Sequence, residues 1–305
     1  MIIFTVLFAI SCRMLSYKYD DGILQMEQFY RQDRDSIDIL VLGSSHAFVD
    51  IDPQILYEHT GASTYDLCAS MQSIWHTYYD LEEALKYQHP RLIILDVFRI
   101  TDEFEYSKDS KLIKSVYGMR PSVTKLNAIR AGLKEDDFSS TALHFTEFAS
   151  YHNRYGSLTG DDINIFSKLP EDYRGHYVAD NVSEQEAPVI DDITESYPIT
   201  DKSREYFVKI LDLAGENDIP VLLINTPYIM TADEKKVYNS LEELLTQLGR
   251  EDVEYLDLNG YVDLIGIDYE KDFADNEHLN GSGTEKLNAY LADYINEHYD
   301  LSGTR

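Results

Sequence analysis

Short apolar segments alternate with longer amphipathic segments along most of this chain. Five apolar runs have the length and composition of buried strands, at 37–43, 63–69, 92–97, 221–225 and 253–258. Other segments place apolar residues at helical spacing, at about 53–60, 73–87, 201–215, 231–248 and 284–298. Strands that alternate with helices predict an α/β protein in which a mostly parallel five-stranded sheet lies between two layers of helices. The topological rules favour the flavodoxin-like strand order 2-1-3-4-5.

The regular alternation fails between about residues 100 and 199. This stretch contains segments with helical spacing at 122–134 and 141–155, and a polar, acidic run at 179–196. A structureless loop of this length would be unusual inside a compact domain. We interpret 100–199 as an insertion after the third strand, with helices of its own, set over the strand ends as a cap or a partner surface.

The chain begins with an almost continuously apolar run, MIIFTVLFAISC, which Arg13 follows. Twelve helical residues span about 18 Å, which is less than the roughly 30 Å of a bilayer core. No Lys or Arg precedes the run, so it is a poor signal peptide. It is either a helix buried against the domain or the remnant of a membrane segment. We favour the remnant because the run has no polar face, so 1–15 is an N-terminal anchor and 16–305 one domain.

Candidate catalytic residues stand near the two ends of the predicted sheet pattern. Gly43-Ser44-Ser45 directly follows the first strand, and ligands bind at the carboxyl ends of strands in open α/β sheets. Asp275 and His278 precede the last helix. A serine, an imidazole and a carboxylate supply the nucleophile, the base and the orienting group of serine hydrolases. The two segments together therefore predict a catalytic pairing.

Composition narrows the range of partners and cofactors. The 305 residues carry a net charge of −29, which argues against nucleic acids and anionic membrane surfaces as direct partners. Cys12 and Cys68 are too few for a disulfide framework or a thiolate metal site. The histidines lack metal-ligand spacing, and no phosphate-binding or dinucleotide-binding glycine motif is present. We therefore expect neither a metal nor a cofactor.

Two short motifs give the chain a resemblance to a known family. Gly43-Ser44-Ser45 and Asp275-x-x-His278 resemble the first and last blocks of the SGNH, or GDSL-like, hydrolases, and the element order agrees over most of 36–297. The His46 that follows the serines, and the ending His278-Leu279-Asn280-x-x-Gly, look most like bacterial envelope-associated members. Those members include relatives of the teichoic-acid D-alanyl-transfer protein and of polysaccharide O-acetylation proteins.

The resemblance implies a fold, an activity and a location. It implies the three-layer SGNH fold, with Ser45 as nucleophile, His278 as general base and Asp275 as its orienting group. The substrate would be an acyl ester of an envelope or extracellular glycan, and the reaction would be hydrolysis or O-acyl transfer. The domain would lie outside the cytoplasm, anchored in the membrane, and a membrane acyltransferase is the expected protein partner.

The chain departs from the family pattern where the oxyanion hole would form. The Gly and the Asn that usually supply it are absent after the second and third strands. The backbone N–H of Ser45, one near Ala69, and the side-chain amide of Gln72 are the candidate replacements. Loss of one such donor typically costs about 10²–10³ in rate. A second function therefore stays open, in which an SGNH-like module with weak or no activity binds a glycan or a membrane acyltransferase.

Two charged residues at the end of the third predicted strand also face the expected crevice. Asp96 ends that strand and Arg99 follows it closely. They either contact the substrate or form a local ion pair, and the sequence does not choose between these interpretations.

Overall fold

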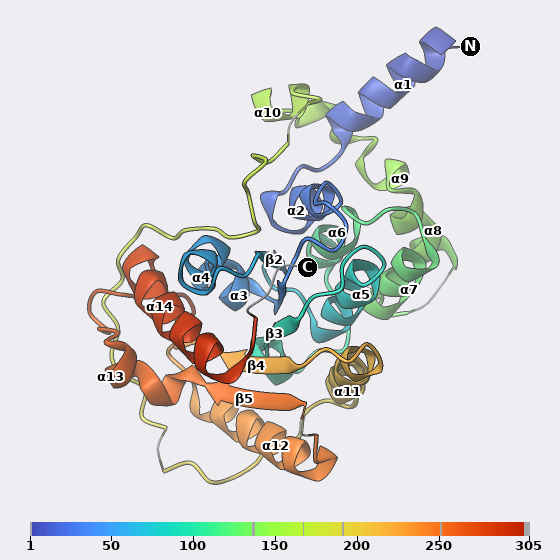
Figure 1. Cartoon of the computed structure of the whole chain (residues 1–305). Helices are drawn as coiled ribbons and strands as arrows, with labels where there is room; N and C mark the ends of the chain where they lie inside the picture. The colour runs from blue at the N-terminus through green and yellow to red at the C-terminus, as the bar shows by residue number, and fades with distance from the viewer. Residues whose placement is uncertain (1, 136–137, 167, 191, 251, 302–305) are drawn as a thin grey trace.

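The computed structural model describes residues 2–135, 138–166, 168–190, 192–250 and 252–301. Its centre is a sheet of five parallel strands with the order β2-β1-β3-β4-β5 (Figure 1). The strands are β1 (Ile39–Gly43), β2 (Thr64–Cys68), β3 (Leu92–Asp96), β4 (Val221–Asn225) and β5 (Val253–Asp257). The predicted α/β class, the parallel sheet and the flavodoxin-like order are confirmed.

Helices cover both faces of the sheet. One face packs against α5 (Ile74–Ala84), α11 (Asp201–Glu216) and α12 (Ala232–Leu248). The other face packs against α3 (Ser45–Asp50), α4 (Pro53–Thr60) and α14 (Gly281–His298). Every residue of β1 to β4 is buried, because strands with helices on both sides have no solvent face.

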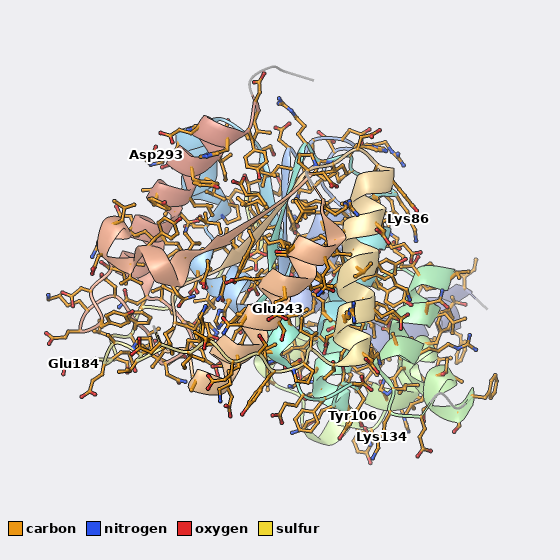
Figure 2. All side chains as sticks on the ribbon, turned by 90° about the horizontal axis from the view of Figure 1, so that it is seen from below. Lys86, Tyr106, Lys134, Glu184, Glu243 and Asp293 are labelled. Atoms are coloured by element: carbon orange, nitrogen blue, oxygen red, sulfur yellow. The ribbon has the colours of Figure 1, made fainter. Side chains whose placement is uncertain are left out.

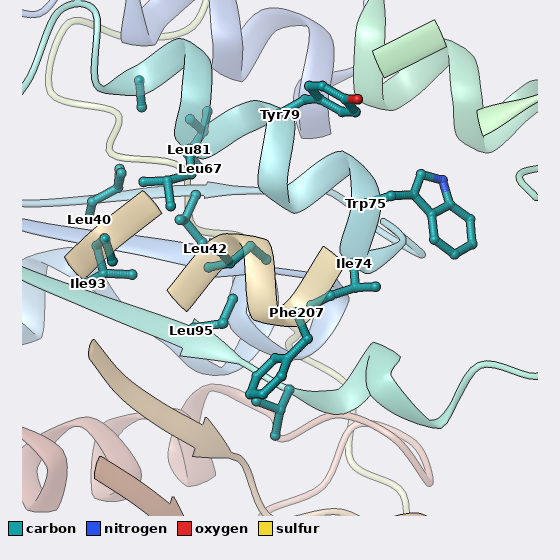
Figure 3. Packing of buried hydrophobic residues seen from close by; sticks show 14 of the residues in the cluster. Leu40, Leu42, Leu67, Ile74, Trp75, Tyr79, Leu81, Ile93, Leu95 and Phe207 are labelled. Carbon is teal, nitrogen blue, oxygen red and sulfur yellow. The ribbon is translucent and has the colours of Figure 1, made fainter. Parts of the chain in front are cut away.

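The first core layer shows why the strands are apolar throughout. Leu40 and Leu42 of β1 and Leu95 of β3 lie in one buried cluster with Ile74 of α5 and Phe207 of α11 (Figure 3). All five side chains are at most 2% exposed. Burial of such side chains contributes roughly 1.5–3 kcal/mol each, so this layer supplies much of the driving force for folding.

Local signals set the ends of several helices. The Asp52 carboxylate accepts hydrogen bonds from the backbone N–H groups of Gln54 and Ile55, Pro53 is the first helical residue, and Gly61 ends α4 in the left-handed conformation. The Asn280 side chain caps α14 in the same way. The helices α4 and α14 pack side by side, and α14 also contacts α3 on the same face of the sheet.

The insertion lies mainly beside α5. It contains α6 (Asp109–Val116), α7 (Val123–Gly132), α8 (Phe138–Thr146), α9 (Phe148–Tyr151) and α10 (Gly160–Ile163). The α7 helix packs on α5 and α8 (Figure 1). The helix predicted at 141–155 is wrong, because the chain breaks between α8 and α9 at Glu147, whose φ is +52°. The described residues between 164 and 200 form no helix or strand.

The N-terminal helix α1 (Ile2–Leu15) projects from the body of the protein (Figure 1). It has no buried residue, so the alternative of a helix packed in the core is wrong. Arg13 at its base pairs with Glu27 of α2 (Gln25–Phe29) at 2.7 Å. No helix within the described residues is long and apolar enough to cross a membrane.

Acidic side chains lie around the outside of the molecule. Glu184, Glu243 and Asp293 come from three distant parts of the chain, and all three are exposed at the surface (Figure 2). The large negative charge is therefore solvated on several faces of the protein.

Candidate functional site

The turn after β1 presents Ser45 at the carboxyl edge of the sheet. Gly43 ends the strand with a φ of +153°, and a Cβ there would lie 2.5 Å from the Cβ of Asp96. Only glycine fits this close approach. The chain then enters α3, with Ser44 as the N-cap and Ser45 as the first helical residue. The Ser45 side chain is 8% exposed and lines a pocket.

The two neighbouring serines have different environments. Ser44 is fully buried, and its hydroxyl and backbone N–H both donate to Oδ2 of Asp96, at 2.8 and 3.0 Å. The other oxygen of Asp96 accepts from the backbone N–H of Phe98 at 2.9 Å. Burial raises the pKa of Asp96, although these hydrogen bonds oppose the shift. Ser44 and Asp96 therefore fix the turn, and Ser45 is the serine that faces the pocket.

The loop before α14 holds a histidine against a carboxylate. The Nδ1 atom of His278 lies 3.0 Å from Oδ1 and 3.1 Å from Oδ2 of Asp275. The backbone N–H groups of Glu277 and His278 also donate to Asp275 Oδ1, at 2.8 and 2.9 Å. Burial raises the pKa of Asp275, but the hydrogen bonds from His278 and Glu277 outweigh burial and hold the pKa below its ordinary value. Asp275 is therefore ionised at neutral pH.

One pocket of about 440 Å³ brings these residues together. Ser45, Asp275 and His278 all line it. The remaining lining residues come from the N-terminal segment, α3, the end of β2, α6, the extended part of the insertion and the loop before α14: Asp20, Asp21, Phe48, Val49, Ser70, Lys114, Tyr177, Ala179, Asn181 and Ala274. The Nε2 atom of His278 is buried and has no hydrogen-bond partner among the described residues, so Ser45 and His278 share the pocket without a direct hydrogen bond.

A buried polar cluster supports the histidine loop from behind. Asp50, the last residue of α3, accepts from the backbone N–H of Leu279 at 2.9 Å and from the hydroxyl of Thr226 at 2.7 Å. Thr226 also lies 3.3 Å from Nδ1 of His46. Burial raises the pKa of Asp50 to about 7, although nearby His278 and both hydrogen bonds oppose the shift. Sequence reasoning missed Asp50 and Thr226.

The ring of His46 is a packing element of the site. It stacks on Phe98 with 3.6 Å between ring centroids, and it meets the His278 ring edge-on at 5.5 Å. Burial lowers the pKa of His46 well below its ordinary value. A neutral, fully buried imidazole orients its neighbour by contact, as expected for a residue in the first turn after the serine.

The residues expected to complete the oxyanion hole lie elsewhere. Gln72 is 2% exposed, its amide donates to the hydroxyl of Thr77 at 3.4 Å, and it does not line the pocket. Ala69 is fully buried, and its carbonyl accepts from the backbone N–H of Gln72 at 3.0 Å. The residue that reaches the pocket from the end of β2 is Ser70. We expected the Gln72 amide to donate to the oxyanion. The structure corrects this expectation, because the amide is engaged at the start of α5.

Arg99 is also outside the pocket that Ser45 lines. It forms an ion pair with Asp102 at 2.6 Å, and it lines a different pocket, which Glu277 also lines. Asp96 lines neither pocket, since its carboxylate is engaged by Ser44 and Phe98 in the turn after β1. Neither side chain therefore lines the pocket of Ser45, and the ion pair that Arg99 makes is with Asp102.

Comparisons with known proteins give no further guidance on this site. No family model matches the chain, and no curated protein is significantly similar to it. Within the part of the chain that the structure describes, no group of three or more His, Cys, Asp and Glu side chains is arranged to hold a metal ion. The chemistry of the pocket therefore has to be argued from its geometry.

Proposed function

We propose that this protein is a serine ester hydrolase or O-acyltransferase. Ser45 is the nucleophile, His278 the general base and Asp275 the group that orients the imidazole. One observation carries the proposal: Ser45 shares a pocket with a histidine whose Nδ1 is bound to a carboxylate and whose buried Nε2 has no hydrogen-bond partner among the described residues. An imidazole held in this way has its basic nitrogen available for a proton from the serine.

The first half of the reaction forms an acyl-enzyme. The Ser45 Oγ attacks the ester carbonyl, and its proton passes to Nε2 of His278. The ionised Asp275 stabilises the imidazolium that results. The tetrahedral intermediate collapses when the bond to the leaving alcohol breaks, and that alcohol takes the proton from His278. The backbone N–H of Ser45, at the start of α3, is the first donor to the oxyanion.

The second half returns the serine to its free form. His278 removes a proton from water or from a sugar hydroxyl, and the oxygen attacks the acyl group on Ser45. Water gives hydrolysis, and a sugar hydroxyl gives O-acyl transfer. Both outcomes use the same side chains, so the acceptor is decided by which of the two reaches the acyl-enzyme.

An acylated glycan of the bacterial envelope is the proposed substrate class. The pocket that Ser45 lines has a volume of about 440 Å³, which lies within the usual range of small-molecule binding sites. Tyr177, which is 56% exposed, stacks on Phe48 in the pocket wall with 6.0 Å between ring centroids. An exposed aromatic face of this kind suits the apolar face of a sugar ring. The resemblance to envelope-associated SGNH members points to the same class.

The exposed apolar helix α1 supports a location at a membrane. Ile2, Ile3 and Phe4 are between 73% and 81% exposed, and Arg13 is the first charged residue of the chain. We propose that α1 belongs to a membrane anchor and that the domain lies outside the cytoplasm. A membrane acyltransferase that supplies the acyl group is the proposed partner.

A specific observation also favours a non-catalytic glycan-binding module. Donors that line the pocket are engaged by other protein groups: the Ser70 N–H binds Asp21, and the Asn181 amide binds the carbonyl of Ala274. A site with an incomplete oxyanion hole keeps its shape for binding but loses much of its rate.

Steady-state hydrolysis distinguishes the two functions. The purified protein is screened with short acyl esters and with an O-acetylated oligosaccharide, in the wild type and in Ser45→Ala. The matched control is Ser203→Ala, which removes a buried hydroxyl outside the pocket. An enzyme loses hydrolysis in Ser45→Ala and keeps it in Ser203→Ala. Oligosaccharide binding without turnover, equal in wild type and Ser45→Ala, would favour the binding module.

A further inference from the structure

One oxygen of the Asp21 carboxylate accepts two hydrogen bonds in the pocket of the proposed nucleophile. Oδ2 of Asp21 accepts from the backbone N–H of Ser70 at 3.1 Å and from Nζ of Lys114 at 2.7 Å. Asp21, Ser70 and Lys114 all line the pocket that contains Ser45 and His278. Asp21 is 8% exposed and the side chain of Lys114 is 27% exposed, so this pairing is partly shielded from water.

Ser45 and Ser70 follow the ends of two neighbouring strands. Gly43 at the end of β1 pairs with Cys68 at the end of β2, and Ser45 and Ser70 both line the pocket at this edge of the sheet. The backbone N–H of Ser70 is a donor that the end of β2 brings to Asp21 in this pocket. A donor at this edge, beside the nucleophile, is where a negative oxygen that develops on the substrate would be stabilised.

The backbone is shaped to bring Asp21 into this position. The turn Asp20–Leu24 has extended φ and ψ values at Asp21 (−76°, 127°) and a φ of +80° at Gly22. A Cβ on Gly22 would lie 2.2 Å from the carbonyl oxygen of Lys114, so only glycine permits this contact with α6. The kink therefore projects the Asp21 carboxylate between α6 and the end of β2.

We propose that the Ser70 N–H and the Lys114 ammonium form the anion-stabilising part of the active site, and that Asp21 occupies this part in the present structure. The carboxylate stands where the substrate oxyanion would lie, so Asp21 is an autoinhibitory residue. The pocket can stabilise the substrate oxyanion fully when the Asp21 carboxylate no longer binds the two donors. The inference rests on the proposed function, because it describes how the same site is regulated.

The turn that carries Asp21 is joined to the exposed helix α1 by a short segment of the chain. The turn Asp20–Leu24 follows α1, and only residues 16–19 separate the two. Arg154 donates to the carbonyls of Leu15 and Ser16 at 2.6 and 2.9 Å, so the base of α1 is tied to the insertion. A change in the position of α1 is therefore transmitted over a short distance to Asp21.

Ester hydrolysis by Asp21→Ala tests the inhibition directly. Since one oxyanion donor is typically worth about 10²–10³ in rate, release of both donors should raise kcat at least about tenfold. Lys114→Met in the Asp21→Ala background should remove much of that gain. Glu205→Gln is the control, because it removes a carboxylate that pairs with a lysine, Lys209, and lies outside the pocket. It should leave kcat unchanged.

The result that overturns the inference is an unchanged or lower kcat in Asp21→Ala while its far-ultraviolet circular dichroism and melting remain cooperative. Activity that appears only in Asp21→Ala would support the inference most strongly. Hydrolysis in neither protein would contradict the proposed function, and a second measurement then decides the inference on its own.

The second measurement is binding of inorganic phosphate, followed by nuclear magnetic resonance of the backbone amides. In Asp21→Ala, the Ser70 amide resonance should move in a saturable manner as phosphate is added. In the wild type it should not move, because the Asp21 carboxylate occupies the donor. An equal response in both proteins would show that Asp21 does not block the donor, and no response in either would show that no anion site is present; each result would overturn the inference.

Discussion

Both carboxylate oxygens of Asp275 lie close to one nitrogen of His278, at 3.0 and 3.1 Å from Nδ1. An ionised carboxylate only accepts hydrogen bonds, so Nδ1 carries the proton in the neutral ring. Nε2 then has a free lone pair, and it is the buried nitrogen for which the part of the chain that the structure describes supplies no hydrogen-bond partner. The pair therefore sets the tautomer that a general base for Ser45 requires.

Asp275→Asn should lower kcat for ester hydrolysis by about 10²–10⁴ and change KM little, because the amide favours the wrong imidazole tautomer. The Asn carbonyl keeps an acceptor for the backbone N–H groups of Glu277 and His278, so the loop should remain folded. Steady-state kinetics measure the effect, and Glu277→Gln, in the same exposed loop, is the control. A kcat within threefold of the wild type would remove Asp275 from the mechanism.

Asp50 should make the stability of the protein depend on pH. Its pKa is raised to about 7 in the folded state, against an ordinary value near 3.9 in the unfolded chain. The folded state therefore keeps a proton that the unfolded state releases. The contribution of this carboxyl group to the free energy of unfolding is complete below about pH 4. At most roughly 4 kcal/mol of it is lost as the pH rises to about 7.

Urea unfolding of the wild type and Asp50→Asn at pH 4, 6 and 8 measures this contribution. The asparagine keeps an acceptor for the Leu279 N–H and has no charge to bury. The wild type should lose stability relative to the variant as the pH rises over this range. A difference in unfolding free energy that is the same at every pH would contradict the raised pKa of Asp50.

Gln72→Ala should leave kcat within about threefold of the wild type. The amide of Gln72 is directed at Thr77 and lies outside the pocket, so its loss removes no donor from the reaction. The variant should instead lose about 1–2 kcal/mol of stability, because a buried hydrogen-bonding group is deleted. Kinetics and thermal melting on one preparation separate the effects, and a fall in kcat of about 10² would restore Gln72 to the oxyanion hole.

Deletion of residues 1–12 should leave the domain folded, with a melting temperature within a few degrees of the wild type. The helix α1 contains no buried residue, and Arg13 and the carbonyls of Leu15 and Ser16 hold its base, which the deletion retains. The deletion removes the ring contact between Phe8 and Phe148, which lies at the surface. Differential scanning calorimetry measures the change. A large loss of melting temperature would show that α1 packs on the domain in solution.

The sheet could be predicted from sequence because each strand is a short apolar run with both faces buried. β1 to β4 lie within the predicted ranges, and caps such as Asp52 fix the start of α4. The helix α3 was not predicted. It has only six residues, and its start depends on the contact between Ser44 and Asp96, two residues that lie 52 positions apart.

The residues of the site also divide into those that local sequence identifies and those that depend on contacts between distant parts of the chain. Ser45, Asp275 and His278 could be selected because each lies in a short motif of recognisable chemistry. Asp50 and Asp21 could not, because their partners lie far away in the chain: Leu279 is 229 positions from Asp50, and Lys114 is 93 positions from Asp21. Such groups acquire their roles only when the fold brings distant segments together.

The most direct test of the central claim is the reaction of Ser45 with a fluorophosphonate, located by mass spectrometry of the digested protein. The serine oxygen attacks phosphorus and fluoride leaves, so a nucleophilic serine gains the phosphonyl group. We predict one adduct on the peptide that contains Ser45, absent in Ser45→Ala and much slower to form in His278→Ala. No adduct on Ser45 in either the wild type or Asp21→Ala, or an adduct on Ser44 instead, would contradict the assignment of Ser45 as the nucleophile.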